Sequence, residues 1–203
     1  INNEIVTEEN EWSVESESNG YSITKHGAEM EVWRGSQEGI DVVIINPGVI
    51  LGAGFWNVNT GQFFSKVANN FKFYTEGITG FVGVNDVAKA MISLVKSDVK
   101  NERFILVSEN NSFREVFALI ANELHKKPPS IRVSKLLSSL FRRVDGLVTF
   151  ITRKKRLITK DSVRSLHGKT EYSSEKIKSA IGFSFEPTKK VIKEICTIYK
   201  KEN

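Results

Sequence analysis

Tyr21 and Lys25 lie four positions apart, a spacing that could allow the two side chains to act together in catalysis. On a helix they lie one turn apart on the same face. A phenol beside an ammonium suits proton transfer to or from a carbonyl oxygen while a hydride moves. Because a nearby positive charge favours the phenolate, the lysine would lower the pKa of the tyrosine from about 10 towards neutral. The same ammonium can bind the ribose hydroxyls of a nicotinamide cofactor.

A second pair, Tyr172 and Lys176, has the same spacing, so spacing alone does not identify the catalytic pair. For both pairs a solvated helix face is the alternative interpretation. Their contexts differ, because the helical pattern that begins at Tyr21 leads directly into a β-branched run at 41–45. Such a run is typical of a strand buried on both faces. We therefore assign the chemistry to Tyr21 and Lys25.

Helical patterns alternate with short apolar runs along the chain, which indicates an α/β fold. Asn46 to Gly54 is predicted to be a loop, because glycines and Pro47 interrupt it. Ser112 followed by Glu115 predicts a capping box, and Asp86 is expected to cap a helix. The strands are predicted at 41–45, 71–74, 81–84 and 103–107, and the helices at 21–38, 60–70, 86–96, 112–126, 134–152, 160–167, 173–181 and 188–201.

The order of these features resembles the extended short-chain dehydrogenase/reductases, the NAD-dependent epimerase/dehydratase family. With Trp12 in an acidic loop, the chain looks most like the dihydroflavonol-reductase-like branch. The resemblance is carried by Tyr21-x-x-x-Lys25, Asn46-Pro47-Gly48, Asp86-Val87-Ala88, Arg103-Phe104-Ile105-Leu106, and Tyr172–Lys176 followed by Ile181-Gly182-Phe183 and Pro187.

This resemblance implies an α/β fold, the C-terminal part of a Rossmann-like doubly wound sheet with a helix-rich substrate lobe. Residues 1–125 would hold the C-terminal half of the Rossmann-like domain and the helix with Tyr21 and Lys25, with lobe segments interleaved. Residues 126–203 would form the basic, mainly helical lobe and the C-terminal helices. The implied activity is that of an NAD(P)-dependent oxidoreductase or epimerase/dehydratase acting on a small hydroxy or keto substrate.

The same resemblance implies a role for each candidate site residue. Tyr21 would be the acid/base and Lys25 its partner, both also contacting NAD or NADP. Tyr172 would be structural. The nicotinamide would be lined by backbone groups of Pro47, Gly48, Val49 and Ile50, and the substrate would lie towards Trp56 and Thr60.

The family's catalytic Ser/Thr and its glycine-rich cofactor turn lie upstream of the Tyr-Lys helix, which here places them before Ile1. We therefore expect a fragment of a longer cytoplasmic enzyme, inactive alone, that lacks the residues setting the choice between NAD and NADP. The expected partner is a small-molecule substrate and not a nucleic acid or a membrane interior, and a homodimer is left open.

A glycine series, Gly77-x-x-Gly80-x-x-Gly83, repeats the spacing of a cofactor turn at an unexpected place. It follows a predicted strand and precedes a helix, as a dinucleotide site would. However, Asp86 would put negative charge near a pyrophosphate that a helix N-terminus should attract. The series also comes after the Tyr-Lys helix, so we interpret it as structural.

Charge is distributed unevenly along the chain. Residues 1–125 carry 9 Lys and Arg against 17 Asp and Glu, a net of −8, whereas residues 126–203 carry 20 against 7, a net of +13. The competing function is therefore a non-catalytic basic interaction or membrane-surface module, centred on the apolar stretch 144–152 and its flanking Arg142-Arg143 and 153–156. No recognition module for nucleic acid accompanies the charge. The histidines have no metal-ligand spacing and are expected at the surface, and one cysteine excludes an internal disulfide.

Overall fold

A computed structural model of the 203-residue chain describes residues 5–10, 20–138 and 160–203. Helices and parallel strands alternate, so the predicted α/β class is confirmed. The helices are α1 (Gly20–Gln37), α2 (Gly61–Ala68), α3 (Val84–Val95), α4 (Phe113–Glu123), α6 (Lys160–His167), α7 (Glu175–Ile181) and α8 (Thr188–Glu202). The strands are β1 (Val43–Pro47), β2 (Val49–Leu51), β3 (Phe73–Tyr74), β4 (Ile78–Gly83), β5 (Glu102–Leu106), β6 (Glu109–Ser112) and β7 (Ile131–Arg132).

The chain packs as two compact units, each assembled from three separate segments. Unit 1 comprises Ile1–Leu51, Gly80–Glu109 and Glu171–Thr188. Unit 2 comprises Gly52–Thr79, Asn110–Thr170 and Lys189–Asn203. These are packing units, and the functional division expected near residue 125 stays a prediction.

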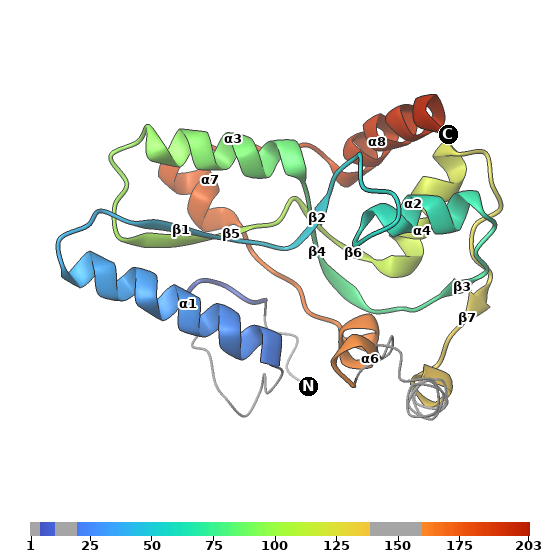
Figure 1. The fold of residues 1–203 in the computed structure, drawn as a ribbon, viewed down its shortest axis with the longest axis horizontal. Helices are drawn as coiled ribbons and strands as arrows, with labels where there is room; N and C mark the ends of the chain where they lie inside the picture. The colour runs from blue at the N-terminus through green and yellow to red at the C-terminus, as the bar shows by residue number, and fades with distance from the viewer. Residues whose placement is uncertain (1–4, 11–19, 139–159) are drawn as a thin grey trace. The chain divides into compact units, whose positions relative to one another are not determined.

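Unit 1 is built around the parallel pair β1 and β5, in which Val43 lies opposite Glu102 and Pro47 opposite Leu106. Figure 1 shows α3 and α7 on one side of this pair and α1 on the other. Side chains alternate between the faces of a strand. Residues such as Ile45 and Phe104 therefore join the core under α3 and α7, and the alternate positions face α1.

The segment after β1 is partly a strand, although a loop was predicted over Asn46 to Gly54. Asn46 and Pro47 complete β1, and Val49–Leu51 form β2, which pairs in parallel with β4 in a three-stranded sheet of order β2-β4-β6. Pro47 is tolerated because β1 lies at the edge of its own two-stranded sheet, where a missing N–H need not break a ladder.

Unit 2 holds a cluster of aromatic rings between α2 and α4. The ring of Phe63 on α2 meets Phe113 and Phe117 edge-on, with centroids 6.2 and 5.3 Å apart. Helix α4 begins with the predicted capping box, since the Ser112 hydroxyl accepts from the Glu115 N–H and the Glu115 carboxylate accepts from the Ser112 N–H. This prediction is confirmed.

Some predicted features fall outside the described residues. Of the helix predicted over 134–152, residues 135–138 are described and are helical. Trp12, Arg142-Arg143, the apolar stretch 144–152 and the basic run 153–156 lie in the ranges that are not described. Among the described helices, none has both the length and the apolar character that crossing a bilayer requires.

Candidate active site

Tyr21 and Lys25 lie in the first turns of α1, and both side chains are exposed. Tyr21 is 74% exposed. Their spacing places them one turn apart on one helix face. The pair is therefore available to a ligand from the solvent side of the helix.

The face of α1 that is half-buried is not the face that carries the periodic apolar residues of the sequence. Ile23 and Met30 are 47% and 43% exposed, and Gly27 is exposed as well. Half-buried positions instead recur at helical spacing through His26, Glu29 and Trp33. Glu29 makes the clearest link to the sheet, because its carboxylate accepts from the side-chain amide of Asn46, 3.3 Å away. Sequence reasoning missed Glu29, although its place one turn after Lys25 is a signal that could have identified it.

The backbone expected to line a nicotinamide is partly used within the protein. The Gly48 N–H donates to the carbonyl of Leu106 at 3.0 Å. Val49 and Ile50 lie in β2, opposite Phe81 and Val82 of β4. Strand β2 lies at the edge of its three-stranded sheet. Contacts from these residues to a cofactor stay a prediction.

The glycine series is a strand and not a turn. Ile78–Gly83 form β4, with its last four residues buried. A Cβ at Gly80 would lie 2.4 Å from Cγ2 of Val107, and a Cβ at Gly48 would lie 2.5 Å from the Gly80 carbonyl oxygen. The glycines at these positions therefore permit close strand packing, in agreement with the structural interpretation of the series.

Asp86 occupies the first turn of α3, three residues into it, and does not cap the helix as predicted. The N-cap is Gly83, with no side-chain cap. The Asp86 carboxylate is 1% exposed and accepts from the backbone N–H of Glu186. A buried carboxylate in the first turn places a negative charge near the helix N-terminus, where it would disfavour an anionic pyrophosphate.

The second Tyr-Lys pair is not arranged like the first. Helix α7 begins at Glu175, so Tyr172 precedes the helix that carries Lys176. Tyr172 forms a parallel bridge with Val6. The Lys176 ammonium pairs with Glu102 at 2.6 Å and lies 5.4 Å from the centroid of the Phe104 ring. Only the first pair therefore shares one helix face.

Trp56 and Thr60, expected near a substrate, lie in unit 2. The indole N–H of Trp56 donates to Glu202 at 2.7 Å, and its ring meets Tyr199 edge-on with 4.8 Å between centroids. Thr60 is the N-cap residue of α2. Trp56 thus holds the loop before α2 to α8, and its contact with a substrate stays a prediction.

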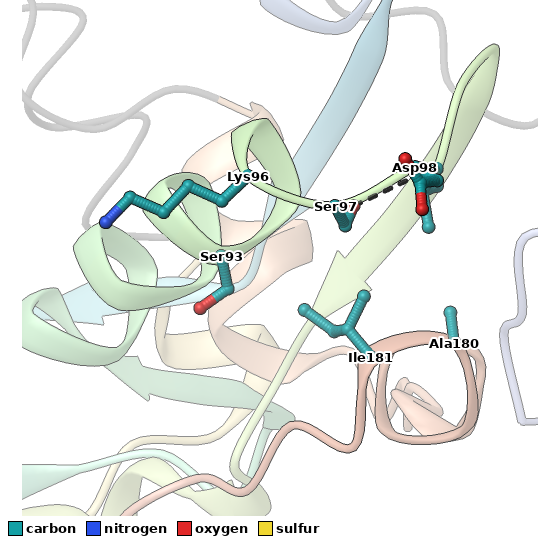
Figure 2. Close-up of a pocket in the computed structure, with 7 residues that line it drawn as sticks. Ser93, Lys96, Ser97, Asp98, Ala180 and Ile181 are labelled. Carbon is teal, nitrogen blue, oxygen red and sulfur yellow. Dashed lines mark hydrogen bonds between the residues drawn. The ribbon is translucent and has the colours of Figure 1, made fainter.

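A depression of about 610 Å³ in unit 1 is lined by none of the candidate site residues (Figure 2). It is next to the amino end of β5, whereas ligands of parallel α/β sheets bind beyond the carboxyl ends of the strands. In Figure 2, Lys96 extends away from Ala180 and Ile181. This depression is therefore not the candidate site. Its lining residues are Ser93, Lys96, Ser97, Asp98, Val99, Ala180 and Ile181.

Other ionisable groups do not form a competing site. In the described ranges, no three His, Cys, Asp or Glu side chains gather as metal ligands would. Cys196 is buried, and burial raises the pKa of its thiol to about 12, which disfavours the reactive thiolate. Of the histidines, His125 is exposed, but His26 and His167 are half-buried, contrary to the expectation of surface positions.

Comparison with known proteins agrees with the architecture. Residues 2–102 match an NAD-binding family model described as "Male sterility protein". No curated protein sequence matches the chain. The crystal structure of gox2253 is similar over 98% of this chain and 61% of that one, with a TM-score of 0.80 and 21% identity. A nucleoside-diphosphate-sugar epimerase from Pseudomonas aeruginosa is similar over 94% of this chain and 58% of its own, with a TM-score of 0.76 and 17% identity.

A third structure, dTDP-glucose 4,6-dehydratase from Bacillus anthracis in complex with NAD, covers 97% of this chain and 58% of its own, with a TM-score of 0.65 and 12% identity. The chain has the fold of the NAD-dependent epimerases and dehydratases. The predicted resemblance is thereby confirmed at the level of the fold. The chain spans about three fifths of the length of the first two of these structures. The dihydroflavonol-reductase-like branch stays a prediction.

Proposed function

We propose that this chain is the part of an NAD(P)-dependent oxidoreductase or epimerase/dehydratase that carries the acid/base pair Tyr21 and Lys25. The observation that supports this most directly is the geometry of α1. Tyr21 and Lys25 share its exposed face, while Glu29 on the same helix bonds to Asn46, which adjoins Pro47 and Gly48. One helix therefore links the candidate acid/base to the backbone segment from Pro47 to Ile50 that is expected beside the nicotinamide.

The residues present fit one end of such a cofactor. An exposed hydroxyl and an exposed ammonium one turn apart are donors suited to a carbonyl oxygen and to ribose hydroxyls. The pyrophosphate end has no counterpart among the described residues, because Gly77–Gly83 lies largely in strand β4 and Asp86 occupies the first turn of α3. Lys25 and the backbone from Pro47 to Ile50 would hold the nicotinamide end of NAD or NADP.

When bound, a nicotinamide cofactor donates or accepts a hydride at the substrate carbon. The residues of this chain transfer the proton that accompanies the hydride. The Tyr21 hydroxyl gives its proton to the substrate oxygen as a carbonyl becomes an alcohol, or the phenolate removes it in reverse. Lys25, held one turn away, stabilises the phenolate. The proposed substrate is a small hydroxy or keto compound.

The experiment is a pair of matched substitutions in the complete protein. Tyr21→Phe removes only the hydroxyl, so turnover should fall by about 10²–10⁴. Tyr172→Phe removes the same group from the pair that does not share a helix, and turnover should stay within about twofold. Equal losses, or no loss from Tyr21→Phe, would exclude the assignment.

A further inference from the structure

Helix α1 lies on the sheet with little apolar support. None of its side chains is fully buried. Trp33 is half-buried, but the large aliphatic residues Ile23, Met30 and Val32 are 42 to 47% exposed. Because burial of apolar area is the usual force that seats a helix on a sheet, the position of α1 must depend strongly on other contacts.

Glu29 supplies such contacts from the middle of the helix. Its side chain is only 15% exposed. One carboxylate oxygen, Oε1, accepts from Arg103 at 3.3 Å and from the indole N–H of Trp33 at 3.4 Å. The other, Oε2, accepts from the amide of Asn46 at 3.3 Å. A largely desolvated carboxylate with three donors is held in one orientation, and hydrogen bonds to a charged group are stronger than neutral ones.

The two partners on the sheet come from neighbouring strands. Asn46 lies in β1 and Arg103 in β5, and Ile44 is the residue opposite Arg103 in the register. Both partners point away from the core under α3 and α7, to which Ile45 and Phe104 belong. Arg103 also donates to the carbonyls of Glu8 and Asn10, so this guanidinium is itself held in place.

We infer that Glu29 is the positioning residue of the candidate site, fixing α1 to β1 and β5 through Asn46 and Arg103. The inference rests on the proposed function. Lys25 is one turn and Tyr21 two turns from Glu29, about 12 Å along the axis at 1.5 Å per residue. A helix released at Glu29 would displace both groups together. An error of about 1 Å in placing a reacting group can cost about 10²-fold in rate.

The first test needs no activity. Hydrogen exchange of the backbone amides in α1 is measured for this chain, for Glu29→Ala and for Glu31→Ala. Glu31 is the matched control, because it lies on the same helix and, within the described part of the chain, its carboxylate pairs with the exposed Arg34 at 2.9 Å. Exchange in residues 21–30 should rise at least tenfold in Glu29→Ala and stay unchanged in Glu31→Ala. Equal exchange in the two variants would overturn the inference.

The second test uses the complete enzyme and the isosteric variant Glu29→Gln, which keeps the side-chain volume if Glu29→Ala does not fold. We expect kcat to fall at least tenfold with the substrate KM within about threefold, whereas Glu31→Gln should change neither. The pH dependence of kcat should keep its shape in Glu29→Gln, since Tyr21 still moves the proton. A loss confined to KM, or activity equal to that of Glu31→Gln, would contradict the inference.

The two proposals fail in different ways. If Tyr21→Phe leaves turnover unchanged, the proposed function is wrong, whatever the exchange data show. If Tyr21→Phe is inactive but the Glu29 variants behave like the Glu31 variants in both tests, the function stands and the positioning role of Glu29 is wrong.

Discussion

The carboxylate of Asp86 accepts a hydrogen bond from the backbone N–H of Glu186, a residue 100 positions later, with 2.8 Å between Oδ2 and nitrogen. The carbonyl of Glu186 accepts from the hydroxyl of Ser108 at 2.6 Å. Residue 186 is thus held on both sides of its backbone. The contact joins the segment after α7 to the first turn of α3, where a negative charge also interacts favourably with the helix dipole.

We expect Asp86→Ala to destabilise the chain by about 1–3 kcal/mol, because it leaves the Glu186 N–H without its acceptor. Asp86→Asn should cost less, since an amide oxygen can replace the acceptor. Chemical denaturation followed by circular dichroism measures both. Asp98→Ala, at an exposed position beyond the end of α3, is the control. A loss in Asp86→Ala no larger than in this control would show that the contact contributes little.

Gly80 and Val107 should behave as a coupled pair. A Cβ at Gly80 would lie 2.4 and 2.7 Å from the two methyl groups of Val107. Gly80→Ala should therefore lower the melting temperature, as overpacking typically costs about 1–3 kcal/mol. Adding Val107→Ala removes those methyl groups, so the double variant should lose less than the sum of the single changes. Strict additivity in a thermal double-mutant cycle would argue against this contact.

The chain by itself should not bind NAD or NADP with useful affinity. Its glycine series is a buried strand, and the N-terminus of α3 already has a buried carboxylate in its first turn. At this position a pyrophosphate would meet a negative charge and no glycine-rich turn, the opposite of what normally binds it. Titration calorimetry with each cofactor is the measurement. Micromolar binding to this chain would show that the described residues include a cofactor site that we have not recognised.

His167 should make stability depend on pH. Its Nε2 lies 2.7 Å from the Ser138 hydroxyl, and burial, followed by Lys135 and Arg132, lowers its pKa below the usual 6.5. As pH falls through about 6.5, the unfolded chain binds a proton that the folded chain does not. The free energy of unfolding should therefore decrease on acidification.

His167→Gln should remove the contribution of His167 to this pH dependence, so the free energy of unfolding should change less between pH 7 and 5.5. The control is His125→Asn, because His125 is exposed and has a positive φ of 54° that asparagine tolerates. Denaturant midpoints of the three proteins across this pH range give the answer. Parallel curves would mean that His167 titrates alike in the folded and unfolded chains.

The parts of the fold that local pattern determines were predictable. The run at 41–45 and the strand at 103–107 became β1 and β5, because consecutive β-branched and aromatic residues suit a strand covered on both sides. The capping box at Ser112 is equally local, since its two partners are three residues apart.

The face of α1 that meets the sheet was not predictable in this way. Hydrophobic periodicity favours Ile23 and Met30, but the half-buried face carries Glu29, whose partners lie 17 and 74 positions away in the sequence. Apart from Trp33 this face is polar, so it leaves no apolar pattern in the sequence. Strand β2 was missed for a related reason, because its pairing with β4 depends on a close approach at Gly48 that composition does not reveal.

The interleaving of the two units has a consequence for the order in which the molecule can assemble. Unit 1 needs Glu171–Thr188 and unit 2 needs Lys189–Asn203, so each includes a segment that is synthesised after residue 170. The pairing of Asp86 with Glu186 must likewise wait for that segment. Neither unit can therefore complete its core until the residues after 170 have been made, and the apolar side chains that those residues cover stay exposed until then.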